Sequence, residues 1–324
     1  AEKKAAYKAD LQDVGAFTPW GEFGMGTGDA ANTGAVTSWN PAGNRTFTAI
    51  SSQFSFIGLT GISAGDLITF FFEGGATKGV IVARATGDSM QGLDLTTGAV
   101  IVRSDDGTAI SNANLNTGDT GDADIMYNVA AGALNLETDV DLVVESGHSF
   151  SPGGAVTLQG TSGNLISGGT MTLGGTLIVT GSLTNTGTFT HNSQLVTFSG
   201  SGAHVAGVVT PPFWNLTVAA TGGTFTATTP LRVEGTLSVT DGSFVLGSNL
   251  TMSMGTSAGG AGVISVNGGT FQMTGATTTI KKLSGAANYS FTVATGAVDI
   301  QDGILQNMDA NGLNMTGGTL TNLE

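Results

Sequence analysis

The residues of this sequence that could carry out acid–base or metal chemistry are few and widely spaced. Its histidines are His148, His191 and His204, and it has no cysteine. No Asp, Glu, Lys or Arg occurs between Ser146 and Leu231, so the sequence places no orienting carboxylate near His191. A catalytic triad needs such an acid, and a zinc site needs several converging ligands. We therefore expect the three histidines to be outward-facing turn residues.

Cleavage of a polysaccharide would need clustered carboxylates together with Arg or Lys. Between residues 146 and 298 the charged side chains are Arg232, Glu234, Asp241, Lys281 and Lys282. Arg232 and Glu234 are two residues apart, and strand alternation puts both on one outward face, where we expect an ion pair. The sequence thus favours a non-enzymatic protein over a polysaccharide-degrading enzyme.

One acidic loop could bind a cation. Asp119, Asp122 and Asp124 lie in a glycine-containing loop, and carboxylates spaced in this way can converge on Ca²⁺. The loop lacks the spacing and the terminal Glu of an EF-hand, and Asp next to Gly is typical of solvated turns. We favour solvated turn acids over a calcium site, and we expect weak or no calcium binding and no other cofactor.

Composition excludes several classes of protein. The 324 residues include 52 Gly and 6 Pro; 40% are hydrophobic, 10% are charged, and the formal net charge is -14. So apolar a chain is not disordered by composition, and its Gly residues lack the third-residue period of collagen. The acidic balance disfavours nucleic acid and anionic lipid as partners, and no apolar run reaches the length of about 18 residues that a membrane-spanning helix needs. The sequence begins with Ala instead of Met, which suggests a mature, processed product.

We divide the sequence into an N-terminal arm over 1–13, a β-sandwich or jelly-roll-like domain over 14–130 and a β-solenoid over 131–324. The arm has a helix-favouring composition but is too short and polar to be a stable helix alone. Short apolar runs between Gly, Asn and Asp clusters predict the strands of the second part. These are Thr46–Ile50, Gln53–Leu59, Leu67–Glu73, Gly79–Ala83 and Ala99–Arg103.

The last part consists of apolar–polar–apolar triplets separated by glycine-rich turns. In Leu237-Ser238-Val239, for example, alternation puts the two apolar side chains on one face. Such short strands bury a core only when they stack in parallel coils, so the pattern favours a parallel β-solenoid over a β-sandwich, whose strands are longer. One series of apolar anchors recurs at every sixth position: Leu165, Met171, Leu177, Leu183, Phe189 and Leu195. The expected core includes Leu177, Leu183, Phe189, Leu216, Leu237, Val239, Phe244 and Leu250.

A known repeat style is visible within this solenoid half. Phe213-Trp214-Asn215-Leu216-Thr217-Val218 is followed by Gly235-Thr236-Leu237-Ser238-Val239-Thr240 and then by Asp241-Gly242-Ser243-Phe244. This form resembles the β-solenoid repeats of large secreted bacterial and archaeal surface proteins, such as adhesin-like and autotransporter-passenger β-helices. The resemblance covers just over half of the chain and implies an extracellular or cell-surface location with an adhesive or structural role.

The apolar repeats continue to the C-terminal residues Leu313, Met315, Leu320 and Leu323, with no Pro, charge cluster or amphipathic helix after them. An uncovered solenoid end exposes strand edges beside an apolar core, so we expect another copy of the chain to cover it. A head-to-tail contact of this kind builds a filament. Two alternatives are a fragment of a longer adhesin and a glycan- or ice-binding solenoid. Binding to ice would need a regular threonine ladder, and Ile178 interrupts the series Thr172, Thr184 and Thr190.

Overall fold

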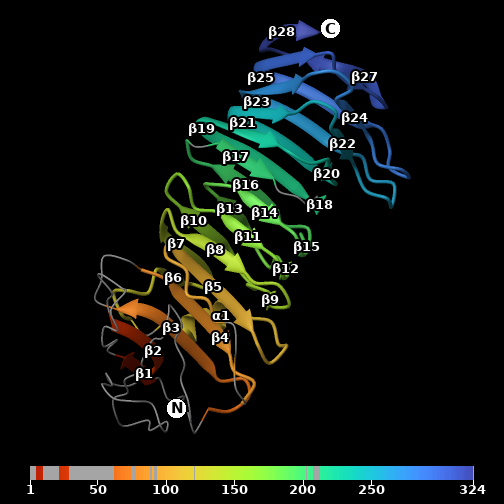
Figure 1. Ribbon diagram of the computed structural model, residues 1–324. Helices are drawn as coiled ribbons and strands as arrows, with labels where there is room; N and C mark the ends of the chain where they lie inside the picture. Colours follow the sequence, from red (N-terminus) through yellow and green to blue (C-terminus); the bar gives the residue numbers. More distant parts are fainter. Residues whose placement is uncertain are drawn as a thin grey trace.

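The computed structural model describes residues 5–9, 22–28, 62–73, 78–87, 90, 93–119, 121–201, 203–206 and 212–323. Over these residues the chain is all-β. It winds in successive coils, and each coil adds parallel strands to the coil before it (Figure 1). The predicted parallel β-solenoid is confirmed. We call its three strand-bearing sides the first, second and third face, in the order in which the chain passes them.

Three sets of strands define these faces. The first face contains β6 (Tyr127–Ala130), β7 (Ala133–Thr138), β10 (Val156–Gln159), β13 (Leu177–Val179), β16 (Leu195–Ser199) and β27 (Met308–Met315). The second contains β3 (Leu67–Glu73), β4 (Val80–Arg84), β5 (Ala99–Ser104), β8 (Asp141–Val144), β11 (Leu165–Ser167), β14 (Leu183–Asn185), β17 (Ala203–Ala206) and β28 (Thr319–Leu323). The third contains β9 (Ser149–Phe150), β12 (Thr170–Thr172), β15 (Thr188–Thr190), β18 (Pro212–Phe213), β20 (Leu231–Val233), β22 (Thr251–Met254), β24 (Thr279–Lys282) and β26 (Ile304–Leu305).

Four long strands each cover both the first and the second face. They are β19 (Asn215–Ala227), β21 (Thr236–Leu246), β23 (Val263–Thr274) and β25 (Tyr289–Gln301). Between the two faces the strands bend at glycine. Gly296, for example, has a φ of 91°, and a Cβ there would overlap the carbonyl oxygen of Gly269 in the coil below. Only glycine fits a positive φ and so close a backbone approach.

The six-residue spacing of the apolar anchors reflects the three faces of one coil. Leu165 pairs with Leu183 on the second face, and Met171 pairs with Phe189 on the third. In β13 and β20 the outer two residues of the triplet point inward and are buried, while the middle residue faces outward. In β12 and β15 the middle residue, Met171 or Phe189, is the buried one. All of the expected core residues except Leu250 are buried, and Leu250 is half-buried against the core.

The anchor expected at Leu195 is wrong by one residue. Val196 is 0% exposed and pairs with Leu177, whereas Leu195 is half-buried on the outer side. The preceding corner contains Asn192 and Ser193, both at positive φ. This tight corner uses one more residue than the regular spacing allows, so the register advances by one.

A column of aromatic rings fills the upper core. The rings of Phe225, Phe244 and Phe271 lie in successive coils, with centroids 5.4 and 5.1 Å apart and planes inclined by 12° and 16°. Phe198 below and Phe291 above extend the column with tilted and edge-on contacts. All of these rings are fully buried. Aromatic contacts across coils therefore add to the stability of this part of the solenoid.

The solenoid pairing begins well before the predicted boundary at residue 131. β3 has the predicted bounds and is antiparallel to β4, but β4 pairs in parallel with β5, and β5 with β8. One apolar core runs without interruption from Phe71 to Ile300. Most of the expected sandwich, with the strands predicted over 46–50 and 53–59, lies outside the described residues.

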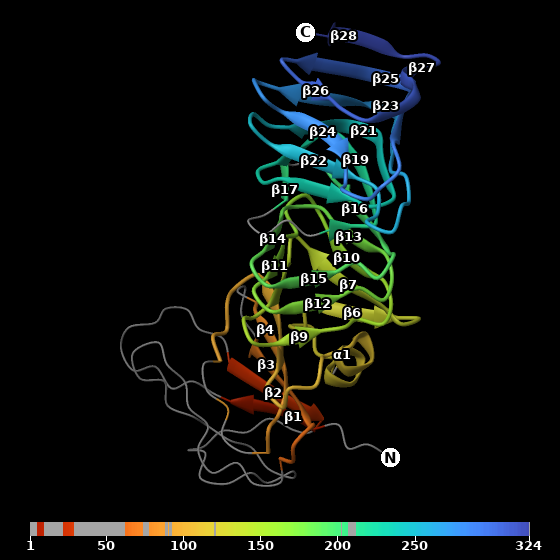
Figure 2. The ribbon, with the colours of Figure 1, turned by 90° about the vertical axis from the view of Figure 1, so that its right-hand side faces the viewer.

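The N-terminal segments differ from the expectation in two ways. In the arm over 1–13 the structure has a strand, β1 (Ala5–Ala9), antiparallel to β2 (Glu22–Gly28), which in turn pairs with β3. A helix that the sequence analysis did not predict, α1 (Asn112–Gly118), lies at the base of the coil stack (Figure 2). Among the described residues no helix is long and apolar enough to cross a membrane.

Local capping explains α1. The side chain of Ser111 accepts a hydrogen bond from the Asn114 backbone N–H, and the Asn114 side chain accepts one from the Ser111 N–H. This reciprocal pair satisfies two amides at the helix start. Leu115 is fully buried in the solenoid core, and its carbonyl accepts a hydrogen bond from the Tyr127 hydroxyl. The helix thus closes the lower end of the core.

Candidate functional site

The three acids of the candidate calcium loop are each placed at a turn. Asp119 ends α1, and its Oδ1 accepts a hydrogen bond from the Gly121 N–H at 2.8 Å. Asp122 Oδ1 accepts one from the Asp124 N–H at 3.0 Å. Within the described part of the chain, no three His, Asp or Glu side chains are placed to hold a metal ion. The structure therefore does not bring the three carboxylates together, and calcium binding stays a prediction to be tested.

A network of charged groups lies at the corner between the second and third faces. Arg103 binds Asp105 through two nitrogens, at 2.8 and 3.2 Å, and its third nitrogen lies 2.9 Å from Glu145 Oε2. Burial raises the pKa of Glu145, although the charges of Arg103 and His148 oppose this shift. His148 Nε2 lies 4.0 Å from Glu145, and its Nδ1 is buried without a hydrogen-bond partner. The expectation of an outward turn residue is therefore wrong for His148.

The neighbouring pair Arg84 and Asp106 has a similar geometry. Arg84 Nε lies 3.0 and 3.2 Å from the two carboxylate oxygens of Asp106, and the Thr108 N–H also donates to this carboxylate. Burial alone would raise the pKa of Asp106, but these hydrogen bonds and the charge of Arg84 outweigh it and lower the pKa. Since the guanidinium groups of both pairs are occupied by carboxylates, we assign this corner a structural role in joining the first coils.

A second corner gathers polar and aromatic side chains from three successive coils. The predicted ion pair is confirmed, with Arg232 Nη2 2.6 Å from Glu234 Oε1. His191 Nε2 lies 3.6 Å from the other oxygen of Glu234, and the ring stacks on Trp214 with centroids 5.9 Å apart. The Ser193 N–H donates to His191 Nδ1, so the neutral ring carries its proton on Nε2, facing Glu234. The expectation of an isolated, outward His191 is wrong, and the His204 side chain lies outside the described residues.

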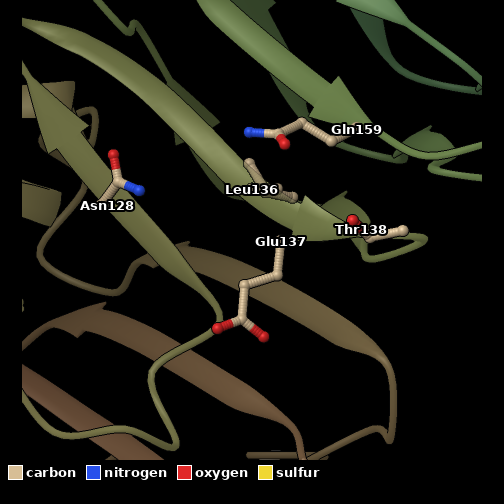
Figure 3. A pocket seen from close by; sticks show the side chains of 5 residues that line it. All are labelled: Asn128, Leu136, Glu137, Thr138 and Gln159. Carbon is tan, nitrogen blue, oxygen red and sulfur yellow. The ribbon is translucent and has the colours of Figure 1, made fainter.

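A shallow hollow of about 400 Å³ opens on the first face. It is lined by Asn128, Leu136, Glu137, Thr138 and Gln159. We call this set the first-face hollow. In Figure 3, Asn128, Glu137 and Gln159 project from three neighbouring strands, β6, β7 and β10. Sequence reasoning missed it because these residues are ordinary surface types, and only the winding of the chain brings them together.

The C-terminal residues predicted for assembly form the last coil, which consists of β26, β27 and β28. We call these three strands the end coil. Leu313 and Met315 pack against the core but are only half-buried, and Leu320 and Leu323 are 41% and 60% exposed. Both β27 and β28 pair with β25, and neither has another strand beside it among the described residues. The structure thus brings these four residues to one end of the solenoid.

The threonine series considered for ice binding does not form one row. Thr172 and Thr190 pair on the third face, whereas Thr184 lies on the second and Ile178 on the first. The first face instead carries a line of outward residues in register. This line comprises Thr157, Ile178, Thr197, Thr217, Ser238, Ser265, Thr292 and Asn314.

Known proteins give no further guide to these sites. No protein-family model, curated protein or solved structure matches the chain. The function must therefore be argued from the geometry of the coils, their end and their outward surfaces.

Proposed function

We propose that the chain is a structural subunit of an extracellular or cell-surface filament, in which copies join head to tail by continuing the parallel strand pairing. The observation that carries this proposal is the exposure of the apolar core at the end coil. The repeat style of the sequence supports the extracellular setting and the adhesive or structural role.

The change in burial over one coil is large. In β25, Tyr289, Phe291 and Val293 are fully buried, whereas Leu320 and Leu323 in the end coil are exposed. Among the described residues no strand pairs with the outer edges of β27 and β28, so their backbone N–H and C=O groups lie open beside this apolar surface. Such an edge is a template for pairing with another strand, which would complete the hydrogen bonds and cover the core.

Charge favours a second copy as the partner. After Lys282 the sequence contains Asp299, Asp302, Asp309 and Glu324 and no Lys or Arg. Its first eight residues have the opposite balance, with Lys3, Lys4 and Lys8 against Glu2. In a chain with so few basic residues, this segment is suited to an acidic solenoid end.

Strand geometry points to the same segment. β1 has five residues, as has β28, and β1 is paired only with β2 among the described residues. In the proposed contact β1 of one copy adds to the end coil of the next. Because the two surfaces differ, each copy keeps one free end and growth continues.

A non-enzymatic role is part of this proposal. Asp105 and Glu145 are both occupied by Arg103 at the base of the solenoid. Glu234 is likewise held between Arg232 and His191. Carboxylates that are held in ion pairs can link neighbouring coils, but they are poorly placed to transfer a proton to a substrate.

The test is the size distribution of the purified chain over a range of concentration and salt, measured by light scattering and negative-stain microscopy. We expect rods that lengthen with concentration and shorten with salt, since salt screens charge attraction. Leu323→Lys should abolish the rods. Ile166→Lys is the matched control, because Ile166 is also an exposed apolar residue (39%, against 60% for Leu323) and lies on the second face, far from the end coil.

A charge exchange tests the identity of the partner segment. Lys8→Glu should shorten the rods, and adding Asp309→Lys to the same chain should restore them. An intact chain that stays a monodisperse monomer at high concentration would refute the proposal. Rods that persist in Leu323→Lys would show that the end coil is not the contact.

A further inference from the structure

We propose that the first-face hollow is a binding site for an uncharged oligosaccharide. This inference goes beyond filament assembly, because the hollow lies near the base of the solenoid and not at the end coil. It rests on the backbone irregularity that forms the hollow, on the side chains that line it and on the surface that continues from it.

A β-bulge creates the hollow. On β10, Thr157 pairs with Asn135 of β7, but Gln159 pairs with Thr138, so β7 has one extra residue in this stretch. The extra residue interrupts the regular pairing of β7 with β10 at Leu136 and Glu137. Bulges of this kind redirect side chains and are frequent beside binding sites.

The lining is polar and has unused hydrogen-bonding capacity. The side chains of Thr138 and Gln159 have no hydrogen-bond partner among the described residues, and Asn128 has a single long contact, with Asn135 at 3.4 Å. Glu137 lies 3.4 Å from Lys78, and both side chains are substantially exposed (49% and 31%). An exposed ion pair of this kind is weak, so a ligand hydroxyl can compete for the carboxylate.

These groups match the chemistry of a sugar. Two amides, a hydroxyl and a carboxylate offer both donors and acceptors, and neighbouring hydroxyls of a pyranose need that combination. The volume of about 400 Å³ falls within the usual range for small-molecule sites, but the lining is more polar than a site for an apolar molecule. The carboxylate of Glu137 and the net charge of -14 disfavour an acidic sugar.

The surface beyond the hollow suits an extended ligand. On the first face the outward hydroxyls lie in one line, in which Ile178 separates the first from the others, and they have no hydrogen-bond partner among the described residues. They belong to Thr157, Thr197, Thr217, Ser238, Ser265 and Thr292. No charged residue interrupts this line, and its rows are about 4.8 Å apart. A linear sugar chain anchored in the hollow can therefore continue along the face.

The experiment is isothermal titration of the intact chain with three probes: cellohexaose, maltohexaose and hexagalacturonic acid. We expect at least one neutral probe to bind and the acidic one to bind at least tenfold more weakly. Gln159→Ala and Glu137→Gln should each weaken binding of the neutral probe about tenfold, the loss expected for one or two hydrogen bonds. The matched control is Gln272→Ala, an outward glutamine of β23 on the second face, which should bind as the parent does.

Amide chemical shifts locate the site independently. The neutral probe should shift signals of β6, β7 and β10, and its binding should persist in the Leu323→Lys variant, so that failure of the filament proposal leaves this test intact. Absence of binding by all three probes would overturn the inference. So would equal affinity for the acidic probe, or unchanged affinity in Gln159→Ala.

Discussion

Replacing Phe244 tests whether the aromatic column stabilises the solenoid beyond ordinary core packing. Phe244 is fully buried, and it is the ring with a near-parallel neighbour on both sides, Phe225 at 5.4 Å and Phe271 at 5.1 Å. Phe244→Leu keeps an apolar side chain of moderate size in the core and removes both ring contacts. Phe244→Ala removes the contacts and most of the volume as well.

The expected losses follow from these contacts. A Phe→Ala change in a core costs about 3–5 kcal/mol because it leaves a cavity. An aromatic pair adds about 0.5–1.5 kcal/mol beyond area burial, so the loss of two pairs in Phe244→Leu should cost about 1–3 kcal/mol. Phe213→Leu is the matched control. Phe213 is also fully buried but has one tilted ring neighbour, Phe189 at 6.2 Å, so its loss should be about half as large.

Urea unfolding followed by circular dichroism measures these losses, and hydrogen exchange locates them. In a solenoid each coil contacts only its neighbours, so exchange should increase in β19, β21 and β23 and stay unchanged in β7 and β10. Equal costs for Phe244→Leu and Phe213→Leu would refute a special contribution of the column. A uniform rise of exchange over all coils would refute the nearest-neighbour account.

Three further predictions concern a core charge, acid stability and calcium. Leu237→Asp buries an unpaired carboxylate at a fully buried position, so the adjoining coils should unfold, and retention of the parent melting temperature would contradict this. Asp106→Asn should lower stability at pH 7 by about 1–3 kcal/mol, since it removes a charged partner of Arg84. Because the pKa of Asp106 is lowered on folding, its contribution is present above the ordinary value of 3.8 and is lost as pH falls through the folded value. The difference between Asp106→Asn and the parent should therefore shrink in acid, and a constant difference in urea titrations from pH 7 to pH 2 would argue against the pairing. Calcium should shift the melting temperature little, and a clear rise that disappears in Asp122→Ala would instead establish a site at that loop.

The repeating part of the fold could be predicted because its information is local. The alternation of apolar and polar residues within a triplet, as in Leu237-Ser238-Val239, indicates which side chains point inward. Glycine indicates where the chain bends. Stacking then follows from the need to bury three-residue strands. The same logic fails where a corner takes an extra residue, as before Val196, because corner length is set by turn geometry and not by the apolar period.

The charged and aromatic clusters could not be predicted in the same way. His191 and Glu234 are far apart in sequence, and they meet only because two full coils return the chain to the same edge. Knowing which residues share an edge requires the exact length of every coil. For α1 a local signal did exist: Ser111 with Asn114 three residues later, followed by Gly118, is a start-and-stop pattern for a short helix.

Because the coils contain different numbers of residues, the length of the solenoid along its axis is not proportional to the length of the sequence. Leu165 pairs with Leu183, and Leu237 pairs with Ile264, so the upper coil uses more chain for the same rise of about 4.8 Å. The additional residues project outward from the coil. An example is the turn at Thr256–Gly260, which two backbone hydrogen bonds close. Insertions at corners thus widen the solenoid but do not change its length along the axis. The axial length increases only when a whole coil is added. During evolution such a protein can therefore gain new loops on its sides without becoming longer.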